Sequence, residues 1–251
     1  MSRDGPAWPY PRWIAHRGAG RLAPENTLAA FALGHAYGYR MFECDVRLSA
    51  DGQAFLLHDD RLERTTSGCG ESLDFDWNTL SVLDAGAWHS ARHAGERLPS
   101  LAAVVDFCRR QGCALNVELK PAPGDERRTG RVVAQQLARS WTWAPPPLLS
   151  SFAVAALEAA AGAAPDLPRA LLLARFEGNW RATAQRLGCV AVVGERSAWT
   201  AAHAERARHA GLRLLAYTVN TDEDAQRLLA LGLDGLITDR VDHFTPDALP
   251  A

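Results

Sequence analysis

The feature that most constrains this 251-residue chain is a regular alternation between short apolar runs and helix-like segments. Parallel strands need a long crossover connection, usually a helix, so the alternation predicts a parallel α/β sheet. Eight strand–helix pairs in about 250 residues are typical of a (β/α)8 TIM barrel, and the eightfold count argues against the alternative, a doubly wound open sheet. The predicted strands lie near residues 13, 41, 114, 148, 170, 190, 214 and 236. Of the predicted helices, one opens after Asn26 and Thr27, either of which can cap it, and another covers Gly130 to Arg139.

Two segments fall outside this rhythm. Residues 53–58 read as an extra strand that turns back on the second strand through Asp51-Gly52. Residues from about 63 to 98 carry Gly, Ser, Asp and Trp without a clean period. We therefore expect residues 1–251 to form a single barrel domain, with a small insertion after the second strand that covers one end of the barrel.

Composition narrows the possible partners and the compartment. The net charge of -2 gives no reason to expect nucleic acid or an anionic membrane as a partner. No apolar run approaches the ~20 residues of a membrane span, and residues 1–12 lack the apolar region of a secretion signal, so we expect no membrane anchor. The five cysteines are an odd set without a C-x-x-C pair, typical of reduced thiols in a cytoplasmic protein. These features leave the oligomeric state unknown.

Carboxylates interrupt the apolar strands in a pattern that points to a cation. Glu43 and Asp45 lie two apart in the second strand, and side chains alternate faces along a strand, so both point the same way. Glu118 occupies the third strand, with Lys120 two residues later. Buried carboxylates without a cation would cost several kcal/mol. We therefore expect one divalent cation held by oxygen ligands, Mg²⁺ or Ca²⁺, with Mn²⁺ also possible.

Two histidines accompany these acids. His16 and Arg17 follow the first strand, and His58 ends the extra strand. Each residue has an ordinary explanation: His16 as a hydrogen-bonded core residue, Glu118 and Lys120 as an ion pair, and the second-strand acids as a network with Arg17 and Arg47. Because the active sites of barrels lie at the carboxyl ends of the strands, convergence of all these side chains at one end favours a catalytic site.

The same residues stand in motifs that together resemble the glycerophosphodiester phosphodiesterase family. The motifs are His16-Arg17-Gly18, Pro24-Glu25-Asn26-Thr27, Glu43-x-Asp45-Val46, Asp51-Gly52, His58-Asp59, Glu118-Leu119-Lys120, Leu83-Asp84-Ala85-Gly86-Ala87-Trp88, Gly95-Glu96-Arg97-Leu98-Pro99, Tyr217-Thr218-Val219-Asn220 and Thr238-Asp239. Tyr217 stands where the family often has Trp.

The resemblance implies a metal-dependent barrel hydrolase. The implied acid–base pair is His16 and His58. The implied ligands of the metal ion are Glu43, Asp45 and Glu118. Arg17 and Lys120 hold the phosphate. The implied substrates are small glycerophosphodiesters such as glycerophosphocholine and glycerophosphoethanolamine, and the implied products are glycerol 3-phosphate and an alcohol. Attack by a metal-activated water and attack by the neighbouring glycerol hydroxyl, through a cyclic intermediate, both remain open, and we favour the second.

Three other functions are compatible with parts of the pattern. A lysine beside Glu118 could form a Schiff base or stabilise a metal-bound enolate if its amine were desolvated. A phosphate-binding module without turnover would need only the cation and Arg17, and the presence of both histidines argues against it. A membrane-acting phospholipase is disfavoured because the sequence has no basic patch or amphipathic anchor.

Overall fold

In the computed structural model, which describes residues 8–246, eight parallel strands close into a barrel. The strands pair in the order β1-β9-β8-β7-β6-β5-β4-β2, and pairing of β2 with β1 completes the ring. This confirms the predicted (β/α)8 barrel. The strands are β1 (Trp13–Ala15), β2 (Met41–Leu48), β4 (Ala114–Leu119), β5 (Leu148–Ser151), β6 (Arg169–Leu173), β7 (Ala191–Glu195), β8 (Arg213–Tyr217) and β9 (Gly235–Thr238).

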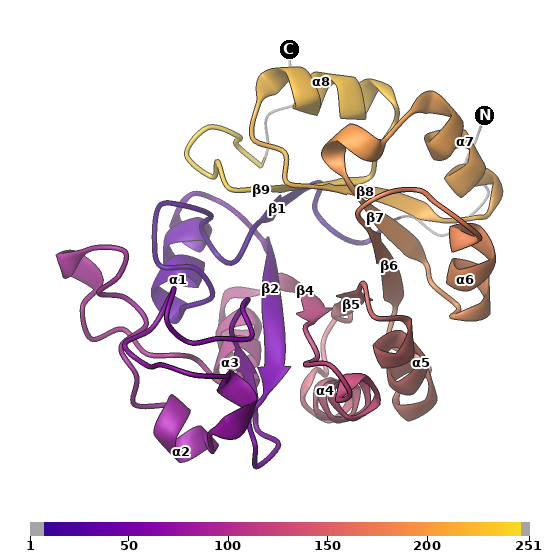
Figure 1. Cartoon of the computed structure of the whole chain (residues 1–251). Helices are drawn as coiled ribbons and strands as arrows, with labels where there is room; N and C mark the ends of the chain where they lie inside the picture. The colour runs from indigo at the N-terminus through magenta and orange to yellow at the C-terminus, as the bar shows by residue number, and fades with distance from the viewer. Residues whose placement is uncertain (1–7, 247–251) are drawn as a thin grey trace.

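Helices between the strands lie around the outside of the barrel (Figure 1). Thr27, one of the two candidate caps in the sequence, caps α1 by accepting a hydrogen bond from the Ala30 amide. Thr221 caps α8 in the same way. The helices are α1 (Leu28–Ala36), α3 (Leu101–Gln111), α4 (Glu126–Ser140), α5 (Val154–Ala163), α6 (Trp180–Arg186), α7 (Ala201–His209) and α8 (Asp222–Ala230).

The strands are apolar on both faces over most of their length because both faces are buried. Outward residues such as Phe42 and Leu115 pack under the helices, whereas inward residues such as Met41 and Ile237 fill the barrel. Along β2 the inward positions continue as Glu43 and Asp45, so the barrel interior changes from apolar to acidic toward the carboxyl ends of the strands. This change places the polar side chains at one end of the barrel.

The extra strand and the insertion are also present. β3 (Ala54–Leu56) runs antiparallel to β2, with Val46 opposite Leu56, so the chain returns along β2 and brings His58 back toward the acids. The segment that follows contains only short helical turns and has a small apolar core of its own, which includes Leu62 and Leu80. The turns are η1 (Ser72–Asp74), α2 (Trp77–Leu80) and η2 (Ala91–His93). The insertion lies on the outer side of α1 and α3, at the left of the view in Figure 1.

Helix α4 begins at Glu126, earlier than the predicted start at Gly130. The sequence predicts Gly130 as the first residue of this helix, but a Cβ at this position would meet the Ala156 carbonyl oxygen of α5 at 2.0 Å. The glycine therefore lies inside α4 and permits close approach of two helices, and it does not mark the start of the helix.

The described part of the chain excludes residues 1–7 and 247–251. Residues 1–7 include most of the segment in which we expect no secretion signal. Between residues 8 and 246, none of the helices combines the length and apolar character that crossing a bilayer requires.

Candidate active site

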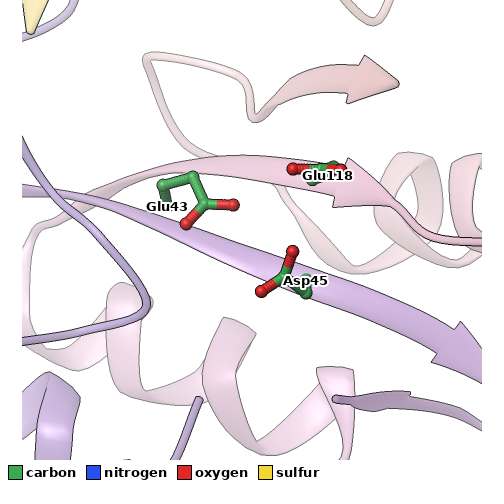
Figure 2. A group of neighbouring side chains, drawn as sticks. All are labelled: Glu43, Asp45 and Glu118. Atoms are coloured by element: carbon green, nitrogen blue, oxygen red, sulfur yellow. The ribbon is translucent and has the colours of Figure 1, made fainter. Parts of the chain in front are cut away.

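The three carboxylates predicted as metal ligands come together at the carboxyl end of the barrel. In the parallel pairing of β2 with β4, Asp45 lies beside Glu118, and Glu43 projects from the same face of β2 (Figure 2). One oxygen from each of the three side chains lies within 4.8 Å of the other two. Because Glu43 and Asp45 are only 3% and 1% exposed, water cannot screen their repulsion.

The pKa values of these acids reflect a negative charge that the protein does not fully compensate. Burial, Asp45 and Glu118 raise the pKa of Glu43 well above its usual value. Burial and Asp45 likewise raise the pKa of Glu118 to about 7, even though Lys120 opposes the shift. Burial also acts to raise the pKa of Asp45, but Arg17, His58 and Lys120 outweigh it and lower that pKa.

The cluster fits a hard divalent cation. All of its donors are carboxylate oxygens, the ligand type that such ions prefer. Glu43 Oε1 is buried and has no hydrogen-bond partner within residues 8–246, so it remains available to a ligand. A positive charge among the three acids would remove the repulsion that raises the pKa values of Glu43 and Glu118.

Asn26 fixes the orientation of Asp45. Its Nδ2 donates to Asp45 Oδ2 at 2.8 Å, and its Oδ1 accepts from the Asp45 amide at 3.1 Å. The sequence suggested Asn26 only as an alternative helix cap, a position that Thr27 occupies. The positive φ of 58° turns the Asn26 side chain away from the helix and toward the site.

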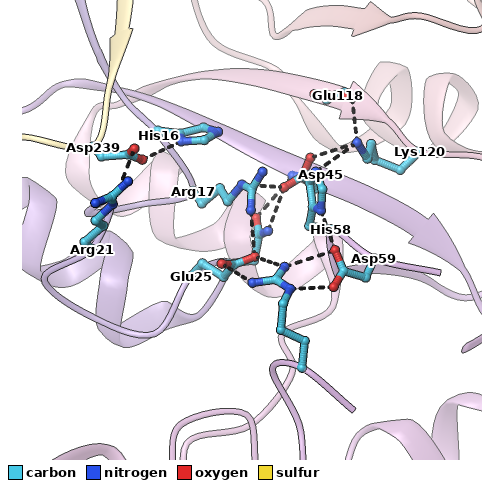
Figure 3. Close-up of polar contacts among 12 residues, drawn as sticks. His16, Arg17, Arg21, Glu25, Asp45, His58, Asp59, Glu118, Lys120 and Asp239 are labelled. Carbon is cyan, nitrogen blue, oxygen red and sulfur yellow. Dashed lines mark hydrogen bonds and ion pairs between the residues drawn. The ribbon is translucent and has the colours of Figure 1, made fainter. Parts of the chain in front are cut away.

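His16 is held by a carboxylate from the last strand (Figure 3). Its Nδ1 donates to Asp239 Oδ1 at 2.6 Å, which leaves Nε2 3.8 Å from Glu43 Oε2. Asn220 donates to the other Asp239 oxygen at 2.8 Å. Burial alone would raise the pKa of Asp239, but the hydrogen bond and charge of His16 outweigh it and lower the pKa to about 2. Asp239 is therefore an ionised partner that orients the imidazole.

His58 is held by its neighbour in sequence, since its Nδ1 lies 2.6 Å from Asp59 Oδ1. Lys120 Nζ lies 3.2 Å from Nε2, and an ammonium can only donate, so Nε2 accepts and Nδ1 carries the proton. Burial, Arg17 and Lys120 lower the pKa of His58 against the opposite effects of Asp45 and Asp59. The surroundings thus favour a neutral imidazole whose Nε2 lone pair points into the site.

The two predicted phosphate ligands both lie among the acids. Arg17 donates from its amide to Glu43 at 3.2 Å, from Nη1 to Glu25 at 2.8 Å, and has Nε 3.2 Å from Asp45 Oδ2. Lys120 Nζ lies 3.1 Å from Glu118 and 3.9 Å from Asp45. The seven side chains singled out in the sequence therefore share one site.

Arg47 does not join the acids on β2. It contacts Asp60 at 2.6 Å and donates to the His58 carbonyl at 2.8 Å. Of the two arginines that could neutralise Glu43 and Asp45, only Arg17 contacts them. The alternative explanation, a network of these acids with both arginines, therefore holds for Arg17 and fails for Arg47.

Comparison with known proteins gives a consistent result. The glycerophosphoryl diester phosphodiesterase family matches residues 16–243. The chain is 32% identical to YhdW of Bacillus subtilis over 93% of this chain and 96% of that protein. It is 31% identical to a glycerophosphodiester phosphodiesterase of Caldanaerobacter subterraneus, over 90% of this chain and 93% of that protein.

A solved structure has the same fold. An Oleispira antarctica phosphodiesterase in complex with the product sn-glycerol-3-phosphate superposes with a TM-score of 0.88 at 34% identity, over 92% of this chain and 93% of that one. The chain therefore belongs to the glycerophosphoryl diester phosphodiesterase family and is a phosphoric diester hydrolase built on a (β/α)8 barrel.

Proposed function

We propose that the protein uses one divalent cation to hydrolyse small glycerophosphodiesters, such as glycerophosphocholine and glycerophosphoethanolamine, to glycerol 3-phosphate and an alcohol. The observation that carries this proposal is the buried acidic cluster of Glu43, Asp45 and Glu118 with a carboxylate-held histidine on either side. The product bound to the Oleispira antarctica phosphodiesterase supports the substrate class.

Glu43, Asp45 and Glu118 would hold the cation, Mg²⁺, Ca²⁺ or Mn²⁺. When bound, the ion supplies positive charge to the phosphate as phosphorus becomes five-coordinate. Arg17 and Lys120 border the same acids and would bind the remaining phosphate oxygens, because the cation takes over the neutralisation of the carboxylates that they now contact.

The two histidines have different surroundings, which suggests different roles. The neutral His58, with its Nε2 lone pair directed into the site, suits the general base. His16 is left for the acid that protonates the departing alcohol, since Asp239 holds its Nδ1 and its Nε2 faces the acidic cluster. A base and an acid with opposite protonation states predict a bell-shaped dependence of kcat/KM on pH.

The glycerol hydroxyl next to the phosphate is the nucleophile that we favour, because this route through a cyclic phosphate needs no residue beyond those named. A substrate that lacks this hydroxyl distinguishes it from direct attack by water. Loss of turnover with the deoxy substrate supports the cyclic route, and undiminished turnover excludes it.

Two alternatives receive less support. Lys120 is ion-paired with Glu118, which does not suit the free amine that a Schiff base requires. A binding module without turnover would not need two histidines with carboxylate partners.

Because all five cysteines are free thiols, we place the reaction in the reducing cytoplasm.

The deciding experiment measures release of glycerol 3-phosphate from glycerophosphocholine and glycerophosphoethanolamine, with and without a chelator. We expect release that stops with chelator and returns with Mg²⁺, Ca²⁺ or Mn²⁺. Substitution His16→Ala should abolish release and leave cation affinity nearly unchanged. Release that persists in the chelator, or in the His16→Ala variant, would contradict the proposed chemistry.

A further inference from the structure

We infer that Arg64 of the insertion is a positioning residue that holds the base His58 and the phosphate ligand Arg17 in their working arrangement. This inference rests on the proposed function. Arg64 comes from a segment that the barrel itself does not require, and it touches neither the acidic cluster nor either histidine. Its contacts are with the two carboxylates that support His58 and Arg17.

The guanidinium of Arg64 bridges these two carboxylates from opposite sides. On one side, Nε lies 2.5 Å from Asp59 Oδ2, and Nη2 lies 3.1 Å from Asp59 Oδ1. On the other side, Nη1 and Nη2 donate to the two oxygens of Glu25 at 2.9 and 2.8 Å. Four charge-assisted contacts from one planar group fix the carboxylates in both distance and orientation.

Each of these carboxylates also accepts a hydrogen bond from a side chain of the site, as Figure 3 shows for the labelled residues. Asp59 accepts from His58 Nδ1, and Glu25 accepts from Arg17 Nη1 at 2.8 Å. Arg64 is therefore the shared link in a chain that runs from His58 through Asp59 and Glu25 to Arg17. Without it, two neighbouring acids would face each other with no cation between them.

The backbone that carries Arg64 is anchored independently of its side chain. Leu62, Thr65 and Thr66 are buried, and Thr66 Oγ1 donates to the Leu62 carbonyl at 2.7 Å. The Arg64 side chain is itself 45% exposed. Truncation should therefore leave the segment in place and open a space, reachable from solvent, between Asp59 and Glu25.

Arg61 provides a matched control in the same segment. It also bridges two carboxylates, Glu63 at 2.5 Å and Glu71 at 3.1 Å, and it is 58% exposed. Neither of those acids contacts a residue of the site. Loss of Arg61 tests whether removing any bridging arginine from the insertion is enough to reduce turnover.

The experiment compares Arg64→Ala, Arg64→Lys and Arg61→Ala with the wild-type protein, using glycerophosphocholine and the metal-loaded enzyme. A displacement of about 1 Å can cost on the order of 100-fold in rate, so we expect Arg64→Ala to lower kcat/KM by about 10- to 100-fold. Lysine cannot reproduce the four contacts and should recover only part of this loss. Arg61→Ala should remain within about twofold of wild type.

Added guanidinium chloride distinguishes positioning from folding. We expect guanidinium to restore part of the activity of Arg64→Ala, beyond the effect of KCl at equal ionic strength, and to leave Arg64→Lys and Arg61→Ala unimproved. A double-mutant cycle adds a second readout, in which Arg64→Ala costs less in an Asp59→Asn background because Arg64 acts through Asp59.

Wild-type kcat/KM in Arg64→Ala, a loss that guanidinium does not reverse, or full additivity with Asp59→Asn would each overturn the inference. If Arg64→Ala does not fold, Arg64→Lys takes its place, and wild-type kcat/KM in that variant has the same meaning. Substitution His58→Ala tests the proposed function separately. Undiminished turnover there contradicts the base, whereas loss there with a normal Arg64→Ala contradicts only the role of Arg64.

Discussion

The substitution Asp239→Asn isolates the contribution of the residue that supports His16. Asp239 lies outside the acidic cluster, so an amide at this position leaves Glu43, Asp45 and Glu118 as they are. Asparagine keeps the shape of the side chain but removes its charge, and its Nδ2 can donate to His16 Nδ1, whereas the Asp239 oxygen accepts from that atom. The imidazole would then carry its proton on Nε2, the atom that faces Glu43.

The pKa of Asp239 gives the scale of the effect. The pKa of Asp239 is about 2, compared with its usual 3.8, and this shift corresponds to about 2 kcal/mol of net interaction with its neighbours, chiefly His16. Burial opposes the shift, so the attraction itself is larger. About 2 kcal/mol corresponds to a loss of roughly 30-fold in rate, and an inverted tautomer can extend the loss to about 10⁴-fold.

The assay measures kcat and KM for glycerol 3-phosphate release, together with cation affinity and the thermal midpoint. We expect kcat to fall by roughly 30- to 10⁴-fold while cation affinity stays nearly constant. Asp242→Asn is the control, because Asp242 pairs at the surface with Arg240 at 3.0 Å and makes no hydrogen bond or ion pair with His16. A folded Asp239→Asn enzyme with wild-type kcat would refute the role assigned to Asp239.

Three further predictions concern the cation site and the barrel. Because the pKa of Glu118 is about 7 without a cation, cation binding must displace the proton of this carboxyl. The apparent cation affinity should therefore rise from pH 6 to pH 8. Calorimetry in buffers of different ionisation enthalpy should detect the released proton. The raised pKa of Glu118 makes the folded protein, in the presence of chelator, less stable as pH rises from 4.5 through about 7. Glu118→Gln should therefore be about 3 kcal/mol more stable than chelated wild type at pH 8, as measured by urea unfolding. Equal or lower stability of the variant would contradict this. Gly130→Ala should cost about 1–3 kcal/mol through its clash with Ala156, whereas Gly162→Ala in α5, with open space around its Cβ, should gain about 0.5–1 kcal/mol.

The barrel could be predicted because its signal is local and repeated. Each strand is buried on both faces and each helix on one, so the alternation of patterns follows directly from the layers. The prediction was wrong at the start of α4, where Gly130 serves a contact with α5. The sequence around a glycine does not reveal whether it bounds a helix or allows a neighbouring helix to approach closely.

The acidic cluster was predictable for a related reason. The two-residue spacing of Glu43 and Asp45 places both side chains on one face of their strand. The active sites of barrels lie at the carboxyl ends of the strands, and this places Glu118 at the same end of the barrel. The supporting residues gave no comparable signal. Arg64 lies in a segment without periodicity, and Asn26 resembles a helix cap. Their roles depend on side-chain directions that only the folded chain defines.

The position of Asp239 connects the fold to the chemistry. His16 follows β1 and Asp239 follows β9, so they lie at opposite ends of the chain. Pairing of Ala15 with Thr238, continued by the bond from the His16 amide to the Thr238 carbonyl at 3.0 Å, places them side by side. Closure of the barrel is therefore what gives His16 its carboxylate. By contrast, the acids on β2 and β4 would remain neighbours in an open sheet. Changes that loosen the β1–β9 seam should thus impair His16, the acid that we propose, while leaving the three carboxylates together.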